Sequence, residues 1–488
     1  MKIAMLIISL ILTLYSFRVI LHGVHMFQQN GYKNKVHRKW IRENYLRCFT
    51  GALKSTPSKK PLVMTPRVVR LLITVVALFV IGCIINRFVG NGITLLVFVA
   101  VYCFILGPYL PIIGNVINSP VEKSISRGFI TKAKKSLESM KDLTVIGITG
   151  SYGKTSVKFY LNTLLSAKFD VLATPESYNT PMGVVKTINT MLRPTHQIFL
   201  CEMGARNVGD IKELCDIVHP DHGIITSIGP QHLESFHTME NIISTKFELA
   251  DALPKGGTIF LNDDNDYIRA HHEDYHVTSY AALGGEADYR AMGIETSRKG
   301  TCFTVEAPGG EREEIATKLI GAHNVANILG AIAVAHSMGI SLKELKIPVR
   351  RLESVEHRLQ LIDKGSITII DDAYNSNPAG AKAALDTLAM FDKDQKILIT
   401  PGMVELGKEE ETLNQAFGGQ AAAAADDIIL VGQKQAVPIA RGIREAGFPE
   451  EHLFILDSFN EAMDCAIRLP GTKHKVILLE NDLPDVLL

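Results

Sequence analysis

The chain has 488 residues, with 51 Lys and Arg residues against 51 Asp and Glu residues. The charge is unevenly distributed, because residues 1–142 carry 20 of the basic residues and only 4 of the acidic ones. A nucleic-acid-binding protein would carry its basic residues on the folded body, so we expect the basic segment to face a membrane surface and expect no nucleic-acid partner. Seven scattered cysteines without CxxC spacing predict neither a disulfide framework nor a zinc cluster.

Three apolar runs lie in the first 115 residues. With its flanks, each run supplies the roughly 20 helical residues that cross a bilayer core of about 30 Å. They predict a transmembrane region over residues 1–115, with helices at about 1–21, 70–87 and 91–112. A cleaved signal peptide explains the first run less well, since no small-residue cleavage site follows it. Buried core helices are the remaining alternative.

The basic residues predict the orientation of these helices. Residues 23–69, between the first two runs, hold ten Lys and Arg residues and one acid, Glu43, and further basic residues follow the third run at 123–135. Both segments are therefore expected in the cytoplasm, which makes the chain a multi-pass cell-membrane protein with cytoplasmic catalytic domains. A juxtamembrane linker helix is expected over 116–142; its apolar face suits either the inner leaflet or packing on the next domain.

A strand, a glycine turn and a helix follow in "LTVIGITGSYGKTSVKFYLNTLLSAK", residues 143–168. Backbone N–H groups of such a turn bind phosphate, Lys154 adds a positive charge, and Thr155 offers a hydroxyl to Mg²⁺. The strict pattern GxxxxGK[ST] is not met, because Ile148 stands where the first glycine belongs. The segment nevertheless predicts an ATP-binding loop.

Two later strands end in polar side chains. Residues 198–205 deliver Glu202, and residues 223–236 deliver His232. Ligands of open α/β sheets bind at the carboxyl ends of strands, so we expect these two side chains to converge with Lys154. Taken singly, a surface carboxylate and a capping histidine remain the alternatives.

Eight segments occur in the order found in the Mur ligases: TGSYGKTS, EMGA, IGPQHLESF, STKFEL, LNDDN, GAHNVANILGA, HRLQ and DDAYNSNP. The set is most similar to the D-alanyl-D-alanine-adding members, the MurF type, over about residues 143–430. The resemblance implies an α/β fold, with a P-loop central domain over 143–355 and a Rossmann-like carboxyl-terminal domain over 356–488. It also implies an ATP-dependent, ADP-forming acid–amino-acid ligase of cell-wall peptide (peptidoglycan) biosynthesis.

The resemblance assigns roles to individual residues. It implies that the following bind the nucleotide: Thr149, Gly150, Ser151, Tyr152, Gly153, Lys154, Thr155, Ser156, His323, Asn324, Asn327, Arg358, Asp372 and Tyr374. Two Mg²⁺ ions would be held by Thr155, Glu202, His232 and Lys246, the last as a carbamylated lysine. The catalytic set would be Lys154, His232, Lys246 and Arg358. Asn375 and Asn377 match the same adenine-side loop as Tyr374, and Glu405 matches a family glutamate.

The chain departs from the MurF pattern at both ends. Apolar helices stand in place of the UDP-sugar-binding domain, and "VILLENDLPDVLL", residues 476–488, stands where a KGSR element is usual. The acceptor, a cell-wall peptide precursor, is therefore left as UDP-linked or lipid-linked, and the amine as an amino acid or a dipeptide. A polymer ligase resembling the poly-γ-glutamate synthases is the second interpretation. An ATP-switched transporter or sensor is the third, although the apolar runs hold almost no polar residues.

Overall fold

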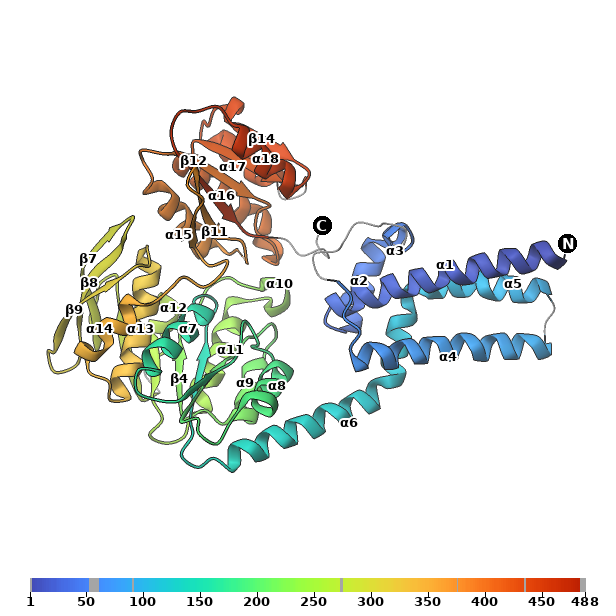
Figure 1. Ribbon diagram of the computed structural model, residues 1–488, viewed down its shortest axis with the longest axis horizontal. Coiled ribbons are helices and arrows are strands. Elements are labelled where there is room, and N and C mark those ends of the chain that lie inside the picture. Colours follow the sequence, from blue (N-terminus) through green and yellow to red (C-terminus); the bar gives the residue numbers. More distant parts are fainter. Residues whose placement is uncertain are drawn as a thin grey trace. The chain divides into compact units, whose positions relative to one another are not determined.

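The computed structural model describes residues 2–51, 61–89, 92–272, 275–374, 376–433 and 436–482 (Figure 1). The chain separates into two compact units. The first comprises residues up to Gly128, and the second comprises Phe129–Asp482.

The described part of the first unit is helical. Its elements are α1 (Lys2–Gln29), α2 (Asn34–Glu43), α3 (Tyr45–Thr50), α4 (Pro66–Val89), α5 (Gly92–Val101), the π-helical turn η2 (Tyr102–Leu106), the 3₁₀ turn η3 (Gly107–Tyr109) and the start of α6 (Leu110–Glu138). Three segments are long and apolar enough to cross a membrane, namely Leu10–Gln29, Pro66–Asn86 and Ile93–Glu138. The number and order of the apolar helices therefore agree with the sequence.

The helix boundaries differ from those expected. Helix α1 continues to Gln29, well beyond residue 21, and its last turns bury Val24 and Phe27 in the core of the unit. The third apolar helix changes to π and 3₁₀ geometry before α6 begins at Leu110. Pro108 lies in this change of geometry; a proline has no backbone N–H and so removes one hydrogen bond from an α-helical ladder. Most of the expected linker, 116–142, belongs to α6.

A nine-stranded sheet forms the first layer of the second unit. Its order is β2 (Val171–Ala173), β3 (Ile198–Glu202), β1 (Thr144–Thr149), β4 (His222–Ile225), β5 (Ile259–Asn262), β6 (Val277–Ala281), β7 (Tyr289–Ser297), β8 (Gly300–Glu306) and β9 (Arg312–Thr317). The strands from β2 to β7 pair in parallel, and β7, β8 and β9 pair antiparallel. The central strands are buried on both faces, which explains their continuous apolar sequences.

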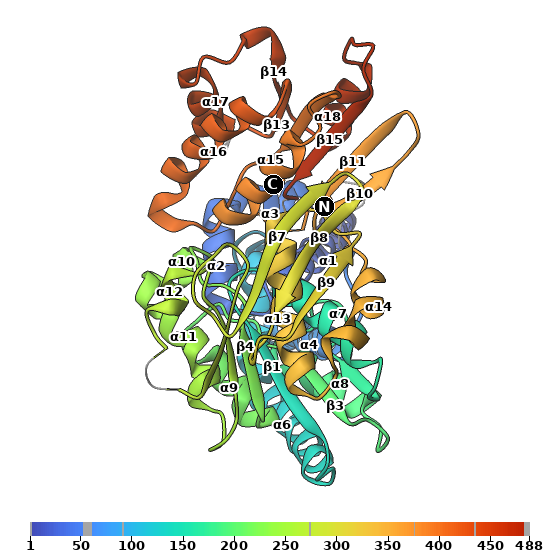
Figure 2. The same ribbon diagram turned by 90° about the vertical axis from the view of Figure 1, so that its left-hand side faces the viewer.

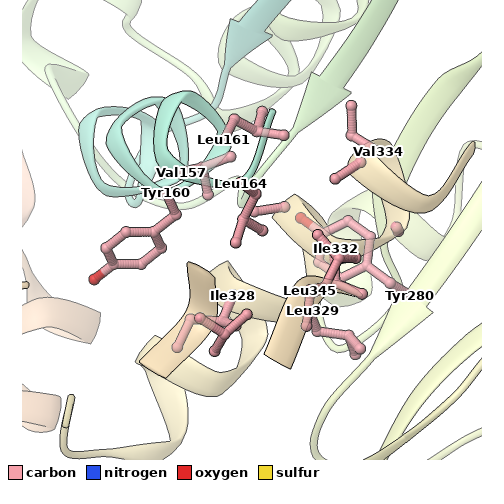
Figure 3. Close-up of a cluster of buried hydrophobic side chains, with 14 of the residues drawn as sticks. Val157, Tyr160, Leu161, Leu164, Tyr280, Ile328, Leu329, Ile332, Val334 and Leu345 are labelled. Carbon is pink, nitrogen blue, oxygen red and sulfur yellow. The ribbon is translucent and has the colours of Figure 1, made fainter. Parts of the chain in front are cut away.

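Helices cover both faces of this sheet. One face carries α7 (Lys154–Leu165), α13 (Ala322–Ser337) and α14 (Leu342–Arg350); the other carries α8 (Pro181–Met191), α9 (Asp210–Val218) and α11 (Met239–Asp251). Short helices α10 (Leu233–Phe236) and α12 (Asp266–Arg269) lie in connections. Figure 3 shows Val157, Leu161 and Leu164 of α7 facing the apolar side chains of α13. This packing fixes the amino terminus of α7 at the sheet edge.

The end of α6 packs on this domain. Ala133 is fully buried in the cluster under α8 and α9, with Ile130 and Leu137 against it. Of the two alternatives left open for the linker helix, the structure therefore favours packing on the domain over lying on the leaflet.

A six-stranded sheet forms the carboxyl-terminal part. Its order is β10 (Gln360–Asp363), β11 (Ile367–Asp372), β15 (Lys475–Glu480), β12 (Gln395–Thr400), β13 (Asp427–Val431) and β14 (Leu453–Leu456). Its helical elements are α15 (Pro378–Ala389), η4 (Gly407–Glu409), α16 (Glu410–Ala424), α17 (Ala436–Glu445), η5 (Glu450–His452) and α18 (Phe459–Arg468). Helices α15, α16 and α17 pack on one face and α18 packs on the other (Figure 2). The α/β fold with a central and a Rossmann-like domain is as expected.

Candidate active site

The loop between β1 and α7 is shaped by two glycines in positive-φ conformations. Gly150 has a φ of 149° and Gly153 a φ of 79°. A Cβ on Gly150 would collide with the hydroxyl of Thr226 and the backbone of Ser227, and one on Gly153 would collide with the amide of Asn327. Only glycine therefore lets the backbone turn so closely before the helix amino terminus. The loop has the form of a phosphate cradle although its first glycine is displaced.

Hydrogen bonds hold the rest of the loop against the β4 end. The Ser151 N–H donates to Ser227 O at 2.6 Å, the Ser151 hydroxyl donates to Gly229 O at 3.0 Å, and the Tyr152 N–H donates to Ser227 Oγ at 3.0 Å. Thr149, the last residue of β1, donates a hydrogen bond from its hydroxyl to Met203 O at 3.0 Å. Ser156 lies in the first turn of α7. These hydrogen bonds hold the loop in place against the end of β4.

Lys154 lies at the first position of α7. Its Nζ donates to Gly150 O at 2.5 Å and to Ser151 O at 3.0 Å, so the ammonium group is folded back over the loop. Burial lowers its pKa to about 8, against the opposing charge of Glu202. An anion in the cradle would restore the charged form.

Glu202, at the end of β3, is fully buried. Its Oε1 accepts from the Thr155 hydroxyl and from Asn179 Nδ2, both at 3.0 Å, and its Oε2 lies 3.0 Å from Lys158 Nζ. The contact with Lys158 does not meet hydrogen-bond geometry, which leaves Oε2 without a hydrogen bond among the described residues. A buried carboxylate oxygen of this kind suits a cation.

His232 lies in the left-handed conformation at the start of α10, with a φ of 53°. Its Nδ1 pairs with Glu405 Oε2 from the loop after β12, and Glu405 Oε1 lies 3.4 Å from Arg206 Nη1. Burial lowers the pKa of His232, while the Glu405 carboxylate opposes this shift. The pair joins the central domain to the carboxyl-terminal domain.

Lys246 lies on α11 and is 2% exposed. Within the described residues it forms no ion pair, and burial lowers the pKa of its amine well below the usual range, with the charge of Lys154 adding to the effect. Burial and the Lys154 charge therefore favour the uncharged form of the Lys246 amine, while the charges of Asp210 and Glu248 oppose this.

These groups converge on Lys154. The charge of Lys154 lowers the pKa of His232 and of Lys246. The charge of Glu202 raises the pKa of Lys154, and the charge of Arg358 lowers it. Charges shift one another's pKa only when they share a neighbourhood, so the residues expected to be catalytic lie in the same part of the second unit.

The start of α13 also faces this region. Asn324 accepts from Tyr160 Oη at 2.9 Å and donates to Ile320 O, and Asn327 lies against Gly153. Burial lowers the pKa of the neighbouring His323 to about 4, so its ring is neutral. The three α13 residues expected at the nucleotide thus lie together beside the loop.

Arg358, Asp372 and Tyr374 come from the carboxyl-terminal domain. The guanidinium of Arg358 stacks over the Tyr374 ring, 4.2 Å from its centre, and the Tyr374 hydroxyl donates to Ser177 Oγ at 2.7 Å. Burial raises the pKa of Asp372 to about 6. Asn377 caps α15, whereas Asn375 lies outside the described residues.

The residues present fit ATP and Mg²⁺. The cradle, Lys154 and Arg358 match phosphate charge, and Thr155 and Glu202 offer oxygen to a cation. Among the described residues no three His, Cys, Asp or Glu side chains form a metal cluster.

Sequence reasoning missed three parts of the site. Lys158, one turn after Lys154, is fully buried beside Glu202, although a lysine is among the residue types least often buried. Asn179, which donates to the same carboxylate, lies in a loop without a motif. Glu480 at the end of β15 pairs in register with Asp372, accepts from Ser376 Oγ at 2.5 Å, and has a pKa raised well above its usual range by burial. For Glu480, the signal in the sequence was its position at the end of an apolar strand, where a side chain of the site can be expected.

Comparisons with known proteins agree with this geometry. The sequence matches the Mur ligase middle domain over residues 148–335 and the Mur ligase glutamate ligase domain over residues 357–480. The chain is 31% identical over 307 residues to the UDP-N-acetylmuramoyl-tripeptide--D-alanyl-D-alanine ligase of Escherichia coli K12, covering 62% of this chain and 67% of that one. It is 30% identical to the Bacillus subtilis 168 ligase of the same name, covering 61% and 64%.

A solved structure of MurF from Acinetobacter baumannii has a TM-score of 0.67 and 27% identity, covering 73% of this chain and 77% of that one. The chain spans about two thirds of the length of the two curated relatives. The chain therefore belongs to the Mur ligase family, whose members are ATP-dependent, ADP-forming amide ligases.

Proposed function

We propose that the chain is a membrane-anchored amide ligase of the MurF type. It joins a carboxyl group of a cell-wall peptide precursor to the amino group of an amino acid or dipeptide, with conversion of ATP to ADP and phosphate. The observation that carries the proposal is the glycine-shaped phosphate loop, in which Thr155, next to Lys154, donates its hydroxyl to the buried Glu202 carboxylate.

The residue types suit phosphoryl transfer to a carboxylate. ATP supplies the γ-phosphoryl group that turns the poorly reactive carboxylate into an acyl phosphate. Lys154 and Arg358 offset the repulsion between the two anions and hold them in line. Thr155 and Glu202 would hold one Mg²⁺, with His232 beside them.

Lys246 suits the role of a carbamylated metal ligand. Only a neutral amine reacts with CO₂, and burial lowers the pKa of the Lys246 amine, which favours that form. Carbamylation would place an anion where the structure has a buried group without an ion pair among the described residues, and a second Mg²⁺ would compensate its charge.

Two contacts across the domains support enclosure of the reaction. His232 pairs with Glu405, and Tyr374 donates to Ser177. Since an acyl phosphate hydrolyses in water, domain contacts that cover the cradle protect the intermediate.

The apolar helices support a lipid-linked acceptor. Three segments can cross a membrane where MurF has a sugar-binding domain, and confinement to a bilayer raises the effective concentration of an acceptor held there. We place the chain in the cell membrane with its catalytic domains in the cytoplasm, since the basic residues flank the apolar segments on that side.

The test uses the purified full-length chain in detergent with ATP, Mg²⁺ and a panel of amines. UDP-linked and lipid-linked muramoyl peptides are offered separately, and amide products are identified by mass. We expect product with the lipid-linked acceptor and none without ATP. The proposal would be contradicted if neither acceptor gave an amide product and if neither changed the rate of ATP hydrolysis.

A further inference from the structure

A hollow of about 380 Å³ lies on the surface of α2 in the first unit, and it is lined by Lys35, Arg38, Lys39, Arg42 and Glu43. The four basic residues follow the spacing i, i+3, i+4 and i+7, so they form one stripe along the helix. With one acid among four cations, the hollow carries a net charge of about +3 by simple residue count.

The opposite face of α2 anchors the helix. His37, Trp40 and Ile41 are buried, the rings of His37 and Trp40 stack with centres 5.5 Å apart, and His37 lies 4.9 Å from the Phe27 ring of α1. The basic stripe is therefore held on a packed helix and is not a loose charged tail.

Its place along the chain puts the stripe next to an apolar segment. Helix α2 begins at Asn34, and the candidate membrane span in α1 ends at Gln29. Exposed apolar side chains at Val36, Tyr45 and Leu46 neighbour the stripe in sequence. Cations beside exposed apolar groups are typical of helices that lie at a membrane surface.

We propose that the hollow on α2 binds the phosphate or diphosphate group of a lipid at the inner membrane surface. Arg38 and Arg42 present planar guanidinium groups that match phosphate oxygens, and Lys35 and Lys39 add point charges. The apolar neighbours suit the hydrocarbon chain that a free phosphate lacks. The inference rests on the proposed membrane placement of the helices, and it does not depend on ligation.

The chain offers a built-in probe, because Trp40 is its single tryptophan and lies on α2. The full-length protein in neutral detergent is titrated with farnesyl diphosphate, farnesol and inorganic pyrophosphate. Binding is followed by Trp40 emission and by calorimetry. We expect saturable binding of farnesyl diphosphate, at least tenfold weaker binding of pyrophosphate, and no saturation with farnesol.

The variant Lys35→Glu/Arg38→Glu tests the site. Reversing two charges removes two attractions of about fivefold each and adds repulsion of the diphosphate, so farnesyl diphosphate binding should weaken by at least tenfold. A milder variant, Arg42→Gln, should weaken it several-fold without charge reversal. The matched control Lys255→Glu/Lys473→Glu reverses two exposed lysines on the second unit and should bind as wild type.

A third variant separates this site from the phosphate loop. Lys154→Ala should retain the Trp40 response to farnesyl diphosphate while losing ATP binding, so failure of the ligase proposal leaves this result unchanged. Wild-type affinity in Lys35→Glu/Arg38→Glu would overturn the site. Equal affinities for pyrophosphate and farnesyl diphosphate would overturn its assignment to a lipid.

Discussion

At the scale of single residues, Lys154 has the central role in the proposed site, because its positive charge would neutralise the phosphate that is transferred. Removing its charge should lower ligation at least about a hundredfold, as loss of a transition-state charge partner does elsewhere. We expect Lys154→Ala to keep the wild-type thermal midpoint, because the side chain bonds only to the loop itself. ADP release and unfolding are measured together. Lys168→Ala is the control, since that lysine also donates to a carbonyl, Gly339 O, but at the far end of the helix. Turnover at the wild-type rate in Lys154→Ala would remove the phosphate-loop assignment.

Lys246 is expected to act as an anionic carbamate. Lys246→Ala should be nearly inactive, and acetate should restore part of the activity by supplying a carboxylate to the vacated space. Depletion of CO₂ should also slow the wild type, because the Lys246 amine then stays unmodified. Rates are compared with and without acetate and bicarbonate. A Lys246→Ala variant as active as wild type would show that the buried amine is structural only.

Asp372 should make stability depend on pH. Burial raises its pKa from 3.8 to about 6, so the folded state binds the proton more tightly than the unfolded state. The folded protein consequently loses stability as pH rises from about 4 through 6, by up to about 3 kcal/mol for this shift. Asp372→Asn should therefore melt above wild type at pH 7, and the difference should shrink towards pH 4. An equal difference at both pH values would contradict a raised pKa.

Single residues differ in how well the sequence predicts them. Lys154 and Thr155 follow from the glycine turn between strand and helix, and Glu202 follows from its strand end. Lys158 could not be found this way, because its burial depends on a carboxylate delivered by a strand over forty positions later. The pairing of His232 with Glu405 joins residues of two domains, and a local pattern contains no information about such a contact.

At the scale of elements, α7, β3 and the loop after β2 meet at Lys158. Its Nζ lies 3.0 Å from Glu202 Oε2 and also donates to Glu176 O. Lys158→Met should leave a buried carboxylate unpaired and cost about 3–5 kcal/mol of the free energy of unfolding. Thermal and urea unfolding measure the loss.

Two further variants complete that experiment. Lys158→Met/Glu202→Gln should regain much of the stability, since no charge is then left alone, but it should stay inactive for lack of the Glu202 carboxylate. Lys382→Met breaks an exposed i, i+4 pair with Asp386 and should change stability by less than about 1 kcal/mol. A Lys158→Met loss no larger than that control would contradict a structural ion pair.

Elements with strong local signals were predictable and others were not. Continuous apolar runs mark β11, β12, β13 and β15 in the sequence, as is typical of strands in a parallel sheet covered on both faces. The sheet edges β10 and β14 are short and only half buried, so their pattern is weak. Helix ends in the first unit were misplaced, because the core packing of Val24 and Phe27 extends α1 beyond the apolar run.

At the scale of the whole molecule, removal of the first unit tests whether this unit does more than attach the chain to a membrane, the role proposed for it. A chain beginning at Phe129 retains the second unit, including Ala133, which is buried in its core. We expect it to fold and bind ATP, because Lys154, Glu202 and Arg358 remain, but to lose ligation, because the segment proposed to hold the acceptor is gone. Nucleotide binding and ligation are measured side by side with the full chain. Full activity of the shortened chain on a soluble UDP-muramoyl peptide would restore a plain MurF assignment.

The central claim, transfer of phosphoryl from ATP to a carboxylate before amide formation, is tested most directly with ¹⁸O. The full-length chain receives an acceptor whose reacting carboxyl group carries ¹⁸O, together with ATP, Mg²⁺ and the amine, and the inorganic phosphate is analysed by mass. The account predicts one ¹⁸O in each phosphate released, one ADP for each amide bond, and neither with Lys154→Ala. Phosphate that takes its new oxygen only from water, while amide is formed, would contradict it.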